Sequence, residues 1–199
     1  RQNGVGTAVI VLREGKPLFT KGYGYSNLEH KVPVQPETVF QAGSIGKMFT
    51  ATGVMLLVEN GEISLDTKLS DFFPDGPEFW RRVTVEHLLS HRSGIRGVTD
   101  PGGALEIDTS KGKMAAIFQH LALLRNEYSE GQYLQLIRKA KMLFEPGTAY
   151  SYSNESYVLL GMIIRQVTGQ FYGDFLNENI FQKFNMETTQ VNENMQVIS

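Results

Sequence analysis

The order of patterns along the sequence predicts an α+β fold, in which strands come first and a series of helices follows. Apolar and β-branched residues fill positions 7–12, a turn pattern follows at 14–17, and a second β-rich run covers 18–24. Two such runs around a short turn are typical of an antiparallel β-hairpin. From Ser44 onwards, the apolar residues recur at helical spacing instead.

The sequence contains no internal repeat and no low-complexity segment. We therefore expect a single domain over residues 1–199, with a sheet portion at 1–40 and a mainly helical portion at 41–199. The clearest helix covers 44–59 and carries apolar residues on nearly every face, which predicts that it is buried. Further helices are expected at 85–89 (capped by Thr84), 113–124, 132–143, 154–168 (capped by Asn154) and 172–180.

The composition excludes several classes of function. A net charge of −2 leaves no basic surface for nucleic acid or for an anionic membrane. The sequence has no cysteine, so disulfides, thiolate catalysis and cysteine-bound zinc are excluded. No apolar run reaches the length of a membrane span, and the four histidines lack metal-ligand spacing. We therefore predict no membrane span, no metal site and no cofactor.

The segment Ser44-Ile45-Gly46-Lys47 combines a hydroxyl and an amine three residues apart at the predicted start of a helix. Residues at this spacing lie on the same helix face. A serine is a weak nucleophile unless a neighbouring base takes its proton, and an adjacent, partly desolvated lysine can act as that base. The same pattern also fits a plain helix start, with Ser44 as N-cap and Lys47 in solvent.

Two other motifs overlap the same serine. A phosphate-binding loop would need a glycine at Gln41 and a serine or threonine at Met48. A nucleophile elbow would need a strand before the serine and a histidine late in the chain. Residues 37–41 are a poor strand, and His120 falls in a predicted helix. Both patterns therefore fit less well than the serine–lysine pair.

A second candidate site is Tyr152-Ser153-Asn154, which follows a Pro-Gly turn and precedes a predicted helix. The Tyr152 phenol could relay a proton, and Asn154 could orient Lys47 or a substrate amide. The alternative is structural, with Asn154 as an N-cap and Tyr152 packed at a turn. His91 and Ser93 could form another catalytic pair, but His91 at a helix end is expected to contact terminal carbonyls.

Five short segments, spread over nearly the whole chain, match a known family in their order and spacing. They lie at 22–25, 40–47, 61–66, 83–94 and 145–154. Together they resemble the serine β-lactamase and penicillin-binding-protein superfamily. The resemblance is greatest to its class C-like branch, which includes D-alanyl-D-alanine carboxypeptidases, D-aminopeptidases and family VIII esterases. It implies a β-lactamase/transpeptidase-like fold, with an N-terminal antiparallel hairpin and a helical region.

The resemblance also implies roles for individual residues. Ser44 would be the acylated nucleophile, Lys47 its activating partner, and Tyr152 the general base and then acid. Asn154 would orient the substrate, and the Ser44 backbone N–H would form half of an oxyanion hole. Which of Lys47 and Tyr152 takes the first proton stays open, because the two would titrate as a coupled pair.

The sequence departs from the family in one respect. A Lys/His/Trp-x-Gly segment, which would edge the site on a later strand, does not follow Asn154. The family's C-terminal strands are also absent from this sequence, so we expect the catalytic domain to be incomplete. Self-association or a second chain could complete the sheet.

The resemblance therefore implies a serine hydrolase that forms an acyl-enzyme with a small ester, a β-lactam or a D-amino-acid peptide. The alternative is a non-catalytic or inactive fragment of such a scaffold that serves binding or regulation. The family favours a periplasmic or secreted location, but no signal peptide is visible and the location stays unknown.

Overall fold

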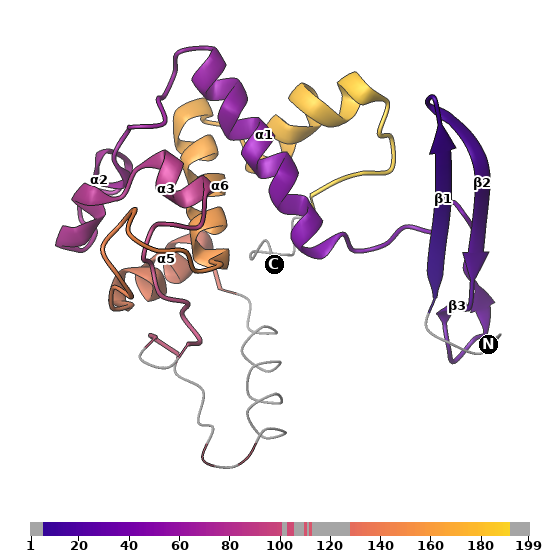
Figure 1. Ribbon diagram of the computed structural model, residues 1–199, viewed down its shortest axis with the longest axis horizontal. Coiled ribbons are helices and arrows are strands. Elements are labelled where there is room, and N and C mark those ends of the chain that lie inside the picture. The colour runs from indigo at the N-terminus through magenta and orange to yellow at the C-terminus, as the bar shows by residue number, and fades with distance from the viewer. Residues whose placement is uncertain (1–5, 101–102, 106–109, 111, 113–127, 192–199) are drawn as a thin grey trace. The chain divides into compact units, whose positions relative to one another are not determined.

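The computed structural model describes residues 6–100, 103–105, 110, 112 and 128–191. The chain divides into two compact units, Arg1–Ala42 and Gly43–Ser199, and each is considered by itself (Figure 1). The predicted helix at 113–124 lies outside the described residues. Among the described residues, no helix is both long and apolar enough to cross a membrane.

The first unit confirms the predicted hairpin. Strand β1 (Thr7–Arg13) pairs antiparallel with β2 (Lys16–Tyr23), and Thr7 lies opposite Tyr23. The turn between them consists of Glu14 and Gly15, which have φ values of 50° and 75°. Positive φ at both central positions matches the right-handed twist of a two-residue hairpin. A second small antiparallel pair is formed by β3 (Tyr25–Asn27) and β4 (Val32–Pro33).

The second unit is helical. In chain order its elements are η1 (Gly43–Ile45), α1 (Gly46–Glu59), α2 (Leu69–Phe72), η2 (Glu78–Arg82), α3 (Val85–Leu89), α5 (Glu130–Lys139), α6 (Asn154–Thr168), α7 (Tyr172–Leu176), η4 (Asn177–Phe181) and η5 (Gln182–Phe184). Thr84 caps α3 as predicted, because its hydroxyl accepts the N–H of His87. The short helix α2 was not among the helices expected from the sequence, and the last predicted helix changes to a π-helical turn at Asn177.

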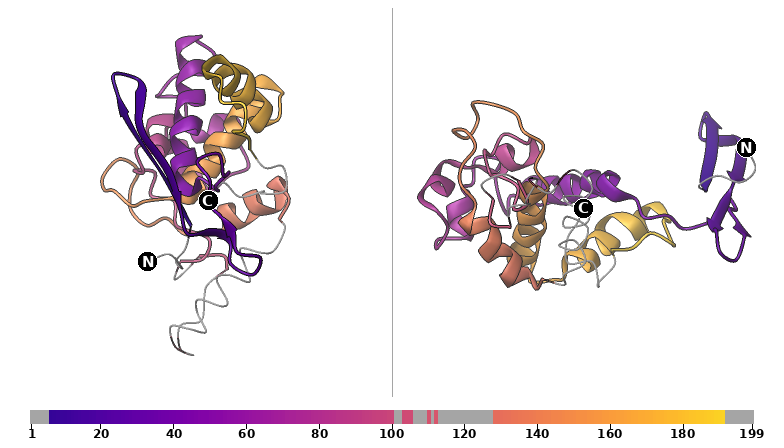
Figure 2. Two further views of the ribbon diagram at one scale, coloured as in Figure 1. Left: turned by 90° about the vertical axis from the view of Figure 1, so that its right-hand side faces the viewer. Right: turned by 90° about the horizontal axis from the view of Figure 1, so that it is seen from below.

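Helix α6 is the centre of the helical unit. Ten of its 15 residues are buried, and it packs against α1, α3, α5 and α7. Figures 1 and 2 show, in different views, that these helices lie around α6. Burying apolar side chains contributes about 25 cal/mol per Å² of apolar surface. The helix that begins at Asn154 is therefore fixed by packing along most of its length.

Helix α1 is buried on only part of its surface. The buried positions include Lys47, Thr50 and Val54, which lie on one helix face, whereas Met48 and Met55 are exposed. The prediction that this helix is buried all round is therefore wrong. Its apolar residues exceed what a single packed face needs, and periodicity alone does not show which face is covered.

A buried carboxylate ties the start of α6 to the chain after α3. Glu155 is 6% exposed, and its Oε1 accepts the backbone N–H of Val98 at 2.9 Å. Burial raises the pKa of Glu155 above its ordinary value, although the hydrogen bond from Val98 favours the charged form. A raised pKa means that this group stabilises the fold most when protonated. That contribution is lost as pH rises from the unfolded value of about 4.3 through the folded pKa.

We expect Glu155→Gln to raise the melting temperature at pH 8, by about 2–4 °C for each kcal/mol gained, and to lose this advantage towards pH 4. Glutamine keeps a carbonyl acceptor for Val98 and removes the buried charge. Glu155→Leu is the matched control, and it should lower the melting temperature at both pH values because the buried Val98 N–H loses its partner. An equal loss for Glu155→Gln at both pH values would contradict the argument.

Candidate active site

Ser44 is the second residue of the helical unit, which begins at Gly43. The 3₁₀ turn η1 contains it, and the preceding Gly43 has a φ of 54°, a conformation that glycine adopts without strain. The Ser44 side chain is exposed, whereas Lys47, one turn later, is only 6% exposed. This local geometry presents the hydroxyl to solvent and keeps the amine inside.

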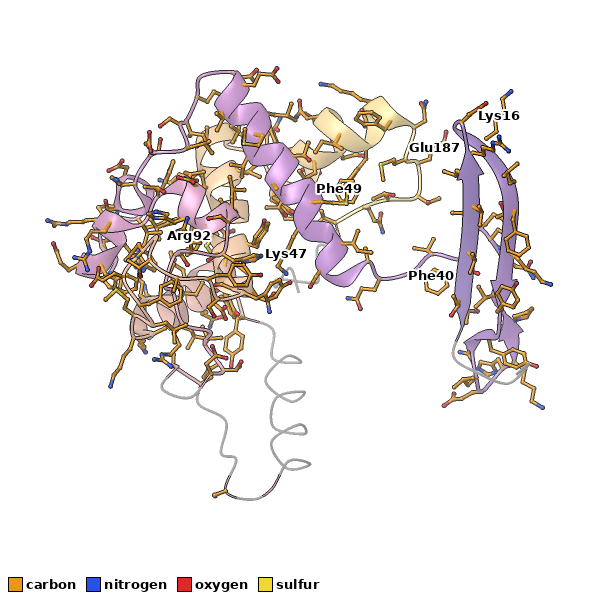
Figure 3. The ribbon with its side chains drawn as sticks, viewed as in Figure 1. Lys16, Phe40, Lys47, Phe49, Arg92 and Glu187 are labelled. Carbon is orange, nitrogen blue, oxygen red and sulfur yellow. The ribbon has the colours of Figure 1, made fainter. Side chains whose placement is uncertain are left out.

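Lys47 is held by three kinds of neighbour. Its Nζ donates to Asn154 Oδ1 at 2.8 Å and, more loosely, to Ser44 Oγ at 3.5 Å. The same Nζ lies 5.0 Å from the ring centroid of Tyr152 and 5.7 Å from that of Tyr157. An amide oxygen and two aromatic faces compensate an ammonium that burial would otherwise penalise. Figure 3 shows Lys47 at the amino-terminal end of α1.

Tyr152 completes the contact to the serine. Its hydroxyl donates to Ser44 Oγ at 2.7 Å, which is shorter than the Lys47–Ser44 distance of 3.5 Å. Burial acts to raise the pKa of Tyr152, but its hydrogen bonds with Lys47 and Ser44 and the charge of Lys47 outweigh this effect. The pKa of Tyr152 is therefore lowered below its ordinary value of about 10. A lowered phenol pKa increases the fraction of tyrosinate near neutral pH.

The cap of α6 differs from the sequence-based expectation. The N-cap is Ser153, whose hydroxyl accepts the N–H of Ser156 at 3.0 Å, and Asn154 is the first residue of the helix. The prediction that Asn154 caps this helix is therefore wrong. Both residue types are good caps, and the neighbouring Lys47 occupies the Asn154 amide oxygen instead.

His91 contacts the Tyr152 segment, which was not expected from the sequence. Its Nδ1 accepts the backbone N–H of Ser153 at 3.1 Å, and its backbone oxygen accepts the N–H of Ser151 at 3.0 Å. Its backbone N–H donates to the carbonyl oxygen of Leu88 at the end of α3. Its side chain, however, faces the Tyr152 segment rather than the helix carbonyls. The expected contact to terminal carbonyls is therefore wrong for the side chain.

Ser93 lies in the interior. It is 1% exposed, its Oγ accepts the N–H of Ile95 at 3.2 Å, and it shares a hydrogen bond of 2.9 Å with Ser156 Oγ. A hydroxyl engaged in this way joins the turn after α3 to α6. It is therefore part of the scaffold below the site.

The structure brings all four sequence-predicted site residues, Ser44, Lys47, Tyr152 and Asn154, into one hydrogen-bonded network. Two of them come from the start of α1 and two from the start of α6, more than 100 residues later. Within the part of the chain that the structure describes, no group of three or more acidic or histidine side chains could hold a metal ion. The arrangement places the Ser44 hydroxyl next to a phenol and an amine, the two kinds of group that can activate a hydroxyl nucleophile.

Comparisons with known proteins show the family to which the chain belongs. The beta-lactamase family model matches residues 1–197. Penicillin-binding protein 4* of Bacillus subtilis (strain 168) is 32% identical over 183 residues, which are 92% of this chain and 37% of that protein.

Two solved structures are similar over the same region. The octameric penicillin-binding protein homologue from Pyrococcus abyssi has a TM-score of 0.73 and 32% identity, over 91% of this chain and 39% of that one. D-amino acid amidase from Ochrobactrum anthropi SV3 has a TM-score of 0.71 and 28% identity, over 91% of this chain and 45% of that one. The chain thus spans less than half the length of each of these relatives. The resemblance and the α+β, β-lactamase/transpeptidase-like fold predicted from the sequence are confirmed, and the chain belongs to the beta-lactamase family.

Proposed function

We propose that this chain carries the nucleophile of a serine hydrolase that acts through an acyl-enzyme, and that residues 1–199 belong to one catalytic domain. The observation that supports this most strongly is the exposed Ser44 hydroxyl held 2.7 Å from the Tyr152 phenol and 3.5 Å from the Lys47 amine. Acyl transfer requires an exposed serine next to a group that can take its proton, and the ionised Tyr152 phenol, with the Lys47 charge beside it, fits that role. Family membership supports the same proposal.

The proposed reaction begins at Ser44 Oγ. The ionised Tyr152 oxygen takes the hydroxyl proton, and Oγ forms a bond to the ester or amide carbonyl carbon. The resulting oxyanion collapses, the bond from carbon to the leaving group breaks, and the Tyr152 hydroxyl returns the proton to the leaving group. Water then attacks the acyl-enzyme in the same manner and releases the acid together with free Ser44.

Tyr152 is proposed as the first proton acceptor for two reasons. Its oxygen is closer to Ser44 than the Lys47 amine is, and the lowered pKa of Tyr152 favours its ionised form. Lys47 would then act through its positive charge, which stabilises the tyrosinate, and through its hydrogen bond to Asn154. Asn154 would present its remaining amide donors to the substrate.

For the substrate, we propose a small ester, a β-lactam or a D-amino-acid amide or peptide. Proteins named penicillin-binding protein and D-amino acid amidase are similar to this chain, which supports β-lactams and D-amino-acid amides as the first compounds to test.

The test is to treat the protein, as encoded in full, with a fluorophosphonate and with a penicillin, and to locate the adduct by peptide mass spectrometry. We expect a single adduct, on the peptide that contains Ser44, and none after heat denaturation. Turnover of p-nitrophenyl esters and of paired D- and L-amino-acid amides then separates an esterase from a D-specific amidase. An adduct on another residue would overturn the proposal, and the absence of both adduct and turnover would favour the non-catalytic binding module.

A further inference from the structure

His91 makes several contacts to the segment that carries Tyr152. Its Nδ1 accepts the N–H of Ser153, and its backbone oxygen accepts the N–H of Ser151. Its ring lies 4.6 Å from the Tyr152 ring, centroid to centroid, at an interplanar angle of 37°. These contacts bracket Tyr152 on both sides along the chain and on one face of its ring. The position of the phenol relative to Ser44 therefore depends on His91.

The contact to Ser153 requires a neutral imidazole. A ring nitrogen that accepts an N–H cannot carry a proton itself, whereas both nitrogens of the imidazolium are donors. Protonation of His91 would thus place an N–H against the N–H of Ser153 and break the hydrogen bond. The Tyr152 segment would then lose its hydrogen bond to the His91 side chain and keep only the one from Ser151 to the His91 backbone oxygen.

The surroundings of His91 also disfavour the charged form. Lys47 of α1 is the cation that faces it, and the phenols of Tyr150, Tyr152 and Tyr157 surround its ring at centroid distances of 5.9, 4.6 and 5.0 Å. Burial first, and then the charge of Lys47, lower the pKa of His91 below its ordinary value, and together they outweigh the backbone of Ser153, which acts to raise it. Because the folded pKa is lowered, the stability from this contact is present above the unfolded value of about 6.5. It is lost as pH falls through the folded pKa.

We propose that neutral His91 is a positioning residue that holds Tyr152 against Ser44, so that protonation of His91 slows acylation at acidic pH. This inference rests on the proposed function, because acylation of Ser44 is the step that it controls. His91 touches neither Ser44 nor the expected substrate position, and it acts only through Tyr152 and Ser153.

The variants His91→Asn and His91→Leu have side chains of similar size, but only the first can accept the hydrogen bond from the Ser153 N–H. His91 has a φ of 58°, a left-handed conformation that asparagine tolerates well. The amide oxygen of His91→Asn falls near the position of Nδ1, so it can accept the Ser153 N–H at every pH. His91→Leu has the same branching without an acceptor. Both variants lose the ring contact to Tyr152. Leucine is also strained at this φ, so a difference in rate that remains where both variants are folded, as judged by their melting temperatures, reports the hydrogen bond.

The experiment measures the rate of Ser44 acylation by a fluorophosphonate from pH 4.5 to 9 in the protein as encoded in full. Below about pH 6.5 we expect the native rate to fall more steeply than the titration of Tyr152 alone produces. Because the rate of every variant also follows the ionisation of Tyr152, each variant is compared with the native protein at the same pH. His91→Asn should stay within about 3-fold of the native rate at neutral pH and exceed it increasingly as pH falls. His91→Leu should be slower than the native protein by about 10²-fold at neutral pH, as for a nucleophile or base misplaced by 1 Å. Melting temperatures at each pH identify any loss that comes from unfolding.

The outcomes are distinct from those that test the proposed function. A ratio of the His91→Asn rate to the native rate that does not change with pH, or equal rates for His91→Asn and His91→Leu, would overturn the role of His91 while leaving Ser44 as the nucleophile. If neither the native protein nor its variants are labelled at Ser44, the proposed function is wrong, and the inference that rests on it is wrong as well.

Discussion

Ser44→Ala is expected to abolish covalent labelling by fluorophosphonates and penicillins and to lower ester turnover to the detection limit. The methyl group has no oxygen with which to form the acyl bond. Loss of a serine nucleophile typically costs about 10⁶-fold in rate, because the remaining groups of the site act only together with it. The measurements are intact mass after labelling and steady-state turnover of a p-nitrophenyl ester.

The matched control is Ser64→Ala. Ser64 is an exposed serine of the same helical unit whose Oγ lies 3.2 Å from Thr67 Oγ1. This variant should be labelled at the native rate. Because Ser44 is also exposed, its replacement should leave the melting temperature nearly unchanged. Native-rate labelling of Ser44→Ala would place the nucleophile at another residue.

The parts of the fold that the sequence predicted well are those fixed by local chemistry. The hairpin turn depends on two adjacent residues that both adopt positive φ, and Gly15 marks it. The cap at Thr84 depends on a hydroxyl and an N–H three residues apart. Such features involve only near neighbours in the chain, and a single sequence contains all the information that they need.

The parts that the sequence predicted poorly depend on distant contacts. Ser153 and Asn154 are equally suitable caps, and the choice between them is made by Lys47, 107 residues earlier, which binds the Asn154 oxygen. The exposed side of α1 could not be identified because Met48 and Met55 are as apolar as the residues that pack. Tertiary packing decides both questions.

The candidate site shows the same division. The spacing of Ser44 and Lys47 indicates a shared helix face from the sequence alone. Pairing them with Tyr152 and Asn154 required the family resemblance, since no local pattern joins residues so far apart. His91 was a candidate from the sequence, but its contact to the Tyr152 segment was not predicted, because the left-handed φ of 58° and the distant Ser153 N–H set the direction of its side chain.

The roles of Tyr152 and Lys47 can be separated by a pair of variants. Lys47→Met keeps an unbranched side chain of similar length in the buried site and removes the charge that lowers the pKa of Tyr152. The pKa of Tyr152 should then rise. Since the ionised phenol is the proposed base, the pH at which acylation reaches half of its maximum should rise as well. An unchanged pH profile would show that Lys47 does not act through Tyr152.

Tyr152→Phe should slow acylation of Ser44 by about 10²–10⁴-fold, the usual contribution of a general acid–base group. The variant removes only the hydroxyl that lies 2.7 Å from Ser44 Oγ, and its ring keeps the stacking contact with His91. The melting temperature should therefore stay close to the native value, so that the loss reports chemistry rather than unfolding. The remaining acylation should lose the dependence on alkaline pH that the Tyr152 titration produces, which single-turnover labelling from pH 6 to 11 would measure. If Tyr152→Phe is labelled at the native rate while Lys47→Met is nearly inactive, the first proton goes to Lys47, and the proposed order of proton transfer must be reversed.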